Sequence, residues 1–245
     1  MIIARLRALR SSNLYSYLFQ NQFLHVMNLV IAVANEAHLP YAETICSLIN
    51  QAARERKTGI AKRKPEYIRH KISEGKAVLA LDGKELAGFC YIESWDNKKY
   101  VANSGLIVHP NYRKSGLAKD IKQRTFELSQ ELYPQARIFG ITTSLAVMKI
   151  NSQLGYQPVT FSELTKDEAF WNGCKGCVNY DILQRTARSM CLCTGMVASP
   201  KNRERDPEVQ NQNSWNGFLH FLNNRKQRAK SRFKDSALIK KLLKS

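Results

Sequence analysis

The sequence lacks an uninterrupted apolar run long enough to cross a membrane, which takes ~20 apolar residues in a helix. Residues 1–26 contain many apolar side chains, but Ser, Asn and Gln interrupt them, and no small-residue cleavage site of a secretory signal follows. Internal repeats are also absent. We therefore expect a cytoplasmic protein with no membrane partner, in whose reducing surroundings the six cysteines do not form stable structural disulfides.

The first 26 residues contain three Arg and no acidic residue. Met27 is then followed by an apolar segment that resembles an ordinary protein N-terminus. We hypothesise that Met27 is the functional start and that residues 1–26 are an upstream extension. A genuine amphipathic N-terminal helix is the alternative. The intact mass of the native protein separates the two, because a mass that includes residue 1 contradicts the hypothesis.

The net charge of +18 is concentrated at the ends of the chain. Residues 1–26 contribute +3 and residues 201–245 contribute +8, which leaves +7 for residues 27–200. Residues 198–245 are rich in Asn, Gln, Arg and Lys without periodicity. They predict a mostly disordered basic tail, with a short helix at 236–243, that binds polyanions weakly. The excess positive charge in the middle suits an enzyme that holds an anionic cofactor.

Apolar periodicity predicts an alternation of strands and helices across the central part of the chain. The apolar fraction of 44% is enough for a real core. An antiparallel meander followed by a strand–helix–strand unit implies an α+β fold, with a mixed, mostly antiparallel sheet flanked by helices. The predicted strands are 28–34, 76–81, 86–94, 100–108, 137–142, 156–161 and 178–183, and the predicted helices are 40–56, 65–74, 116–132 and 144–154.

The connection between strand 100–108 and helix 116–132 has the form Arg-x-x-Gly-x-Ala, from Arg113 to Ala118. Gly116 lets the backbone approach a ligand closely. The amides of residues 114–118 point outward from the start of the helix, where the helix dipole, Arg113 and Lys114 attract an anion such as a pyrophosphate. The alternative is an ordinary strand–helix connection in which the glycine only eases a turn.

This motif, in its strand–turn–helix position, resembles the signature of the GNAT N-acyltransferase superfamily. Leu154-Gly155-Tyr156 is similar to the Gly-Phe pair of that family, and the resemblance spans about residues 28–162. It implies a GNAT domain over 27–165, a cysteine-containing extension over 166–197, and a cofactor cleft where strand 100–108 splays from strand 137–142. The implied cofactor is acetyl-CoA or another acyl-CoA, bound by Leu106, Ile107, Val108, Arg113, Lys114, Ser115, Gly116, Leu117, Ala118 and Lys119.

Other strings resemble a narrower bacterial GNAT subfamily that is associated with arginine biosynthesis. They include residues 58–63, 89–95, 101–108 and 170–174. The resemblance implies transfer of an acetyl or succinyl group to the amine of a small molecule, an amino acid such as glutamate. Two alternatives stay open: acetylation of a protein Lys or N-terminus, and a non-catalytic acyl-CoA-binding protein whose basic tail binds nucleic acid. The oligomeric state is open as well, with a homodimer as one option.

The catalytic groups are less regular than the cofactor motif. In the family a Tyr four residues before the glycine of the Gly-Phe pair protonates the departing thiolate, and here that position is Asn151, which can still hydrogen-bond the cofactor. Glu93, on the strand beside the cofactor strand, is the candidate general base, with a solvent-facing carboxylate as the alternative. Lys62 and Arg63 are candidates to bind a substrate carboxylate. Their alternative is a solvated basic loop.

Four cysteines cluster late in the sequence, as Cys174-x-x-Cys177 and, after thirteen residues, Cys191-x-Cys193. Two close pairs of thiolates are typical of a structural zinc site. Reduced structural thiols and a redox disulfide are the alternatives. Metal analysis of protein purified without chelator distinguishes the zinc site, since a stoichiometry near zero excludes it.

Overall fold

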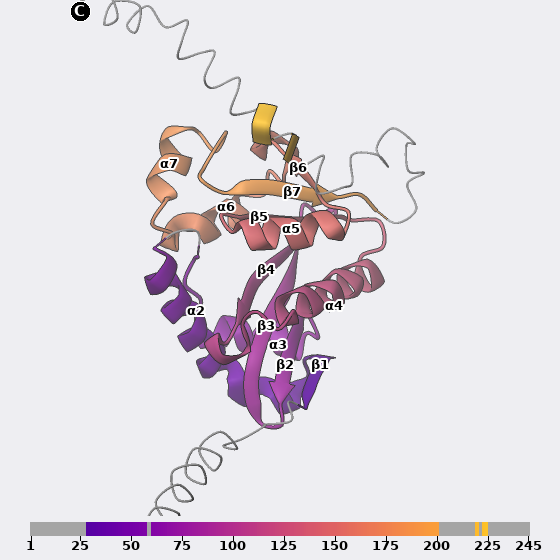
Figure 1. Cartoon of the computed structure of the whole chain (residues 1–245). Coiled ribbons are helices and arrows are strands. Elements are labelled where there is room, and N and C mark those ends of the chain that lie inside the picture. The colour runs from indigo at the N-terminus through magenta and orange to yellow at the C-terminus, as the bar shows by residue number, and fades with distance from the viewer. Residues whose placement is uncertain (1–27, 58–59, 201–218, 221, 225–245) are drawn as a thin grey trace, which may run out of the picture.

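The computed structural model describes residues 28–57, 60–200, 219–220 and 222–224. A seven-stranded sheet in the order β1-β2-β3-β4-β5-β7-β6 forms its centre (Figure 1). Neighbouring strands are antiparallel except for the parallel pair β4 and β5, which confirms the predicted α+β fold with a mixed, mostly antiparallel sheet. The strands are β1 (Leu29–Val33), β2 (Ala77–Asp82), β3 (Glu85–Trp95), β4 (Tyr100–Val108), β5 (Arg137–Thr142), β6 (Gln157–Val159) and β7 (Thr194–Ala198).

Helices cover both faces of the sheet. On one face α2 (Ala42–Arg56) and α3 (Pro65–Ser73) pack with Phe89 and Tyr91 of β3. On the other face α4 (Leu117–Leu132) packs with Cys90 and Ile92, because successive side chains of a strand point to opposite faces. The remaining helical segments are η1 (Glu36–Tyr41), η2 (Pro110–Tyr112), α5 (Leu145–Gln153), η3 (Phe161–Glu163), α6 (Glu168–Asn172), η4 (Gly173–Gly176) and α7 (Tyr180–Arg185).

The strands β4 and β5 pair over only three positions and then separate. Tyr100, Val101 and Ala102 face residues 137–139, and no later pair of the two strands is in register. The other edge of β5 pairs with β7. The splayed cleft implied by the family resemblance is therefore present. It leaves the second half of β4 with an open backbone edge.

The segment that carries the four clustered cysteines folds differently from the prediction. The sequence predicts a strand at residues 178–183, but Tyr180–Arg185 is the helix α7, which buries Leu183 and leaves Val178 70% exposed. The last strand is instead β7, which inserts between β5 and β6. A short apolar run does not distinguish a strand from a helix by periodicity, and only pairing along the free edge of β5 selects residues 194–198.

Some predictions concern residues that the structure does not describe. Residues 1–26 and the helix expected at 236–243 lie outside the described ranges, as does most of the basic tail. Residues 219–220 and 222–224 of the tail are helical, and Leu222 packs against the core cluster that contains Ile138 and Met148. In the described part of the chain, no helix is long and apolar enough to span a membrane.

The contact between β3 and α4 leaves no room for a side chain at Gly88. A Cβ atom there would lie 2.4 Å from Ile121 Cδ1 and 3.0 Å from the Ile107 carbonyl oxygen. We expect Gly88→Ala to lower the free energy of unfolding by about 1–3 kcal/mol, the usual cost of overpacking a core. Denaturant unfolding measures this change. The matched control is Gly173→Ala, where nothing lies within 4 Å and the change should stay within about 0.5 kcal/mol. Equal losses in both variants would contradict the prediction.

Candidate active site

A cavity of about 600 Å³ opens where β4 and β5 separate. Residues 103–107 of β4 and 140–142 of β5 form its two edges, residues 60–64 lie before α3, and the segment from α6 to β7 closes another side. The volume is in the range of small-ligand and cofactor sites. Leu106 and Ile107, two of the predicted cofactor residues, line this cavity.

The charges around the cavity are strongly biased toward one sign. Among the described residues that line it, five are cationic and a single one, Glu93, is acidic. The cations come from the end of α2, the loop before α3 and the middle of α4. A cavity with this lining favours an anionic ligand over a neutral one. The five are Arg56, Lys62, Arg63, Lys64 and Lys122.

The predicted anion-binding turn lies beyond the end of β4, outside the lining of the cavity. Gly116 is the N-cap of α4 with a φ of 91°, and Lys114 also adopts a left-handed backbone with a φ of 68°. The Ser115 hydroxyl donates to the Tyr112 carbonyl at 2.7 Å, which tightens the turn. Arg113 forms an ion pair with Glu55 of α2 at 3.4 Å. The turn therefore presents the helix N-terminus, while part of the charge of Arg113 is already compensated.

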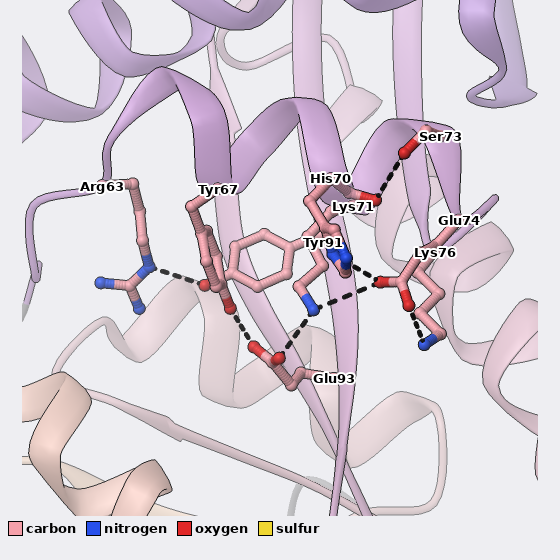
Figure 2. Close-up of polar contacts among 9 residues, drawn as sticks. All are labelled: Arg63, Tyr67, His70, Lys71, Ser73, Glu74, Lys76, Tyr91 and Glu93. Carbon is pink, nitrogen blue, oxygen red and sulfur yellow. Dashed lines mark hydrogen bonds and ion pairs between the residues drawn. The ribbon is translucent and has the colours of Figure 1, made fainter.

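Glu93 faces the cavity and belongs to a buried polar network (Figure 2). Its carboxylate accepts hydrogen bonds from the Tyr67 hydroxyl and from Lys71 Nζ, the latter at 2.6 Å. Its side chain is 19% exposed, so the solvent-facing alternative does not apply. Burial, and then the neighbouring Tyr91 and Glu93, raise the pKa of Tyr67 far above its usual value. Tyr67 therefore stays protonated and acts as a donor to Glu93.

Arg63 is held beside this network by two tyrosines. Its Nε donates to the Tyr91 hydroxyl at 2.7 Å, and its Nη1 donates to the Lys62 carbonyl at 3.0 Å. The guanidinium carbon lies 5.9 Å from the centre of the Tyr67 ring and 6.0 Å from that of Tyr91. Arg63 and Glu93 thus both line the cavity, and Figure 2 shows Tyr67 between them. Lys62 also lines the cavity, but its residue is exposed.

Gly105 supports Tyr91 from the neighbouring strand. It interrupts β4 with a φ of 68°, opposite an irregularity in the pairing between Phe89 and Tyr91. A Cβ atom at Gly105 would lie 2.6 Å from Cε1 of the Tyr91 ring. The position of the ring, and through it that of the Arg63 guanidinium, thus depends on the absence of a side chain at residue 105.

A second buried polar cluster lies on the α4 side of the splay. Lys122 Nζ donates to Asn103 Oδ1 at 3.0 Å, and the Tyr156 hydroxyl donates to the same oxygen at 2.8 Å. Asn103 Nδ2 in turn donates to the Ser129 hydroxyl at 2.7 Å. Lys122 is 2% exposed, and burial lowers its pKa to about 8. Within the part of the chain that the structure describes, no carboxylate forms an ion pair with it.

Asn151, in the position of the missing tyrosine, also lines the cavity and is 1% exposed. Its Nδ2 has a weak contact with Met196 Sδ at 3.7 Å. Its Oδ1 is buried without a hydrogen-bond partner among the described residues. A buried amide oxygen is costly to leave unpaired, which points to a role in holding a ligand.

The four clustered cysteines line the cavity as free thiols. Across the described ranges, no three His, Cys, Asp or Glu side chains are arranged to hold a metal ion, and the zinc site of Cys174, Cys177, Cys191 and Cys193 stays a prediction from spacing. Burial, and then the neighbouring thiols, raise the pKa of Cys174 to about 11 and that of Cys193 to about 12. Three of the four, Cys174, Cys191 and Cys193, pack against a largely aromatic core, as expected for the alternative of structural thiols.

Sequence reasoning missed Tyr67, Lys71, Tyr91, Asn103 and Lys122. Part of the signal was in the sequence. Tyr67 and Lys71 are four residues apart on one helix, so they face the same way. Lys122 and Ser129 share a stripe of α4 beside its apolar face, and both are buried. The sequence pattern did not indicate which strand residues these helices contact, since Asn103 and Tyr91 come close to them only in the folded protein.

Comparison with known proteins agrees with this geometry. Residues 42–144 match the model of the acetyltransferase (GNAT) family. The fold is similar to N-acetylglutamate synthase from Neisseria gonorrhoeae with coenzyme A and N-acetyl-glutamate (TM-score 0.51, 16% identity, covering 71% of this chain but only 35% of that chain). It is also similar to a GNAT acetyltransferase from Staphylococcus aureus (TM-score 0.51, 15% identity, covering 71% of this chain and 99% of that chain). No curated protein has a significantly similar sequence.

The splayed sheet, its cavity and the family match define the class of acyl-CoA-dependent N-acyltransferases. Within that class, residues 42–144 of this chain are similar to the GNAT acetyltransferase family.

Proposed function

We propose that this enzyme transfers an acetyl or succinyl group from acyl-CoA to the amine of a small molecule with a carboxylate, an amino acid such as glutamate. The observation that carries the proposal is that Arg63 and Glu93 line the same cavity, with Tyr67 between them, and that Glu93 is the single acidic residue among the described lining residues. Arg63 binds the carboxylate of the acceptor, and Glu93 receives its amine.

The cofactor is proposed to run along β4 into the cavity, from the turn before α4, which lies outside the cavity lining. We place the pyrophosphate at the N-terminus of α4, against the backbone of residues 114–119 with Arg113 beside it, because amide groups and the helix dipole attract an anion there. The pantetheine arm then follows the open edge of β4 along Leu106, Ile107 and Val108. A backbone N–H of this edge polarises the thioester carbonyl and stabilises the oxyanion. This path directs the acyl group toward Glu93.

Glu93 is proposed to take the proton of the acceptor's ammonium. Its two oxygens accept one hydrogen bond each, from Tyr67 and from Lys71, and a carboxylate has room for further donors. The amine then attacks the thioester carbonyl directly. The presence of N-acetyl-glutamate and coenzyme A in the Neisseria structure supports the choice of an amino acid, although that likeness extends to the fold alone.

A thiol-release assay tests the function directly. We expect free CoA to appear when the full chain is given acetyl-CoA or succinyl-CoA together with one member of an amino-acid panel, with acidic amino acids among the best acceptors. Measurable CoA binding without release for any pair would contradict the enzyme and favour a non-catalytic acyl-CoA-binding protein. Release with peptides alone would favour protein acetylation.

The role of Arg63 predicts a selective loss of acceptor binding. We expect Arg63→Gln to raise the KM for the amino-acid acceptor about 10- to 100-fold, because a charged hydrogen bond to a carboxylate contributes about 1.5–3 kcal/mol. The KM for acyl-CoA should hardly change. Arg69→Gln is the matched control, since it removes the same charge and Arg69 pairs with Glu43 away from the cavity. An equal rise in both variants would mean that only the overall charge matters.

A further inference from the structure

The most unusual group of the cavity is the buried ammonium of Lys122. It is 2% exposed, and it donates a hydrogen bond to a neutral amide oxygen, that of Asn103, at 3.0 Å. A buried lysine is costly unless a carboxylate pairs with it or it serves a function. Among the described residues, no carboxylate compensates this one. The other buried lysine, Lys71, has both Glu93 and Glu74 as partners.

Lys122 lies at the apex of the splay. Asn103, its partner, directly follows Ala102, the last residue of β4 that pairs with β5. Both Asn103 and Lys122 line the cavity. Gly140, the next residue of β5, leaves the gap open, because a Cβ atom there would be 3.5 Å from the Asn103 carbonyl oxygen and 3.9 Å from Asn151 Nδ2. The ammonium therefore borders the closed end of the gap between β4 and β5, where we expect the acyl end of the cofactor arm to lie.

The two polar groups of the cavity belong to opposite faces of the sheet. Glu93 and Tyr91 belong with α2 and α3, whereas Lys122 comes from α4 together with Cys90 and Ile92. A thioester in the gap between β4 and β5 thus has a carboxylate on one side and an ammonium on the other. This arrangement suits a reaction that removes a proton on one face and returns one on the other.

We propose that Lys122 is the proton donor to the thiolate of CoA. The inference rests on the acyl transfer proposed above. The acceptor nitrogen forms a bond to the thioester carbon, and the tetrahedral intermediate then breaks its C–S bond with the electron pair on sulfur. A proton moves from Lys122 Nζ to sulfur and gives the free thiol. Of the two protons that the acceptor's ammonium loses, one restores Lys122 and the other goes to solvent.

Asn151 supports this assignment from the position where the family places its tyrosine. An amide cannot donate a proton as an acid, so the proton has to come from another side chain. Asn151 Oδ1 is buried in the cavity lining without a partner among the described residues, which leaves it free to accept a hydrogen bond from the cofactor. Asn151 thus positions the cofactor while Lys122 supplies the proton.

The protonation state of Lys122 suits this role. Burial lowers its pKa to about 8, near that of a thiol, so that proton transfer in either direction is nearly balanced. The titratable groups that face it are Cys90 from β3 and Tyr156 from beyond α5. Burial raises the pKa of each, so both are neutral near pH 8.

The test is the pH profile of kcat with saturating acyl-CoA and acceptor. A proton donor must be protonated, so wild-type kcat should fall as the pH rises through about 8, the pKa of Lys122. We expect Lys122→Met to lower kcat about 100-fold and to remove this alkaline limb. The Kd for CoA and the thermal midpoint should stay near the wild-type values, because methionine fills a similar volume.

Two further variants separate proton donation from a structural role. Lys122→Arg keeps a positive charge that does not dissociate, and it should be as inactive as Lys122→Met. Tyr156→Phe removes the other donor to Asn103 and should keep the alkaline limb. An alkaline limb that persists in Lys122→Met, or full activity of Lys122→Arg, overturns the proposal. Absence of thiol release by the wild-type enzyme would contradict the proposed function instead.

Discussion

Replacing Glu93 by glutamine is expected to lower kcat about 100- to 10,000-fold, the usual contribution of a positioned general base. Glutamine keeps the shape of the side chain and can still accept a hydrogen bond from Tyr67 or Lys71. It cannot take the proton of the acceptor's ammonium. Steady-state thiol release with both substrates saturating measures the effect. The KM for acyl-CoA should be nearly unchanged, because the cofactor is proposed to lie along β4 and the turn before α4, whereas Glu93 is on β3.

The loss has to be separated from the effect of disturbing Lys71. Glu74 is the second carboxylate that contacts Lys71, at 3.5 Å, and it does not line the cavity. Glu74→Gln therefore removes a carboxylate from the same lysine without removing the proposed base. We expect its kcat to stay within a few-fold of wild type. A comparable loss in the two variants would mean that Glu93 only compensates the charge of Lys71.

Introducing a carboxylate at the start of α4 is expected to weaken CoA binding about 100-fold. Gly116→Asp places a negative charge where the amides and the helix dipole are proposed to hold the pyrophosphate, and a factor of 100 corresponds to about 2.7 kcal/mol. Calorimetric titration with CoA measures the Kd. Steric exclusion is not the cause, because nothing lies within 4 Å of a Cβ atom at Gly116.

Gly155→Asp is the matched control for this loss. Gly155 has a φ of 87°, close to the 91° of Gly116, and a Cβ atom at Gly155 would likewise have nothing within 4 Å. The backbone strain and the added charge are therefore similar, but Gly155 does not lie at the N-terminus of α4. We expect its Kd for CoA to remain near wild type. Equal weakening in both variants would place the pyrophosphate elsewhere.

The sequence predictions were accurate where a structure depends on residues close together in the chain, and they failed where it depends on contacts between distant segments. The helix at 117–132 and the turn before it depend on local signals, namely a glycine that accepts a left-handed backbone and an apolar period that repeats along one helix. Residues 178–183 have no such local signal. Their outcome depends on β7 pairing with β5, a contact between segments more than 50 residues apart in the chain.

The functional-site residues show the same difference between local and long-range interactions. Arg63 and Glu93 could each be proposed from residue type and element, but their meeting in one cavity depends on Tyr91 and on the bulge opposite Gly105. The zinc prediction relied on spacing alone and stays a prediction, because spacing does not set how half-buried thiols pack. Lys122 was missed because a lysine on a helix is normally solvated, and nothing local marks this one as buried.

By itself, the sequence determined the α+β class and the turn at the start of α4, since both follow from patterns of residues close together in the chain, and its family resemblance implied the splayed cleft. Only the tertiary structure decided which charges face one another across the sheet. It paired Glu93 with Lys71, left Lys122 without a carboxylate among the described residues, and brought both to one cavity. The physical reason is that the free energy of a buried charge depends on its distant neighbours, which only the assembled fold specifies.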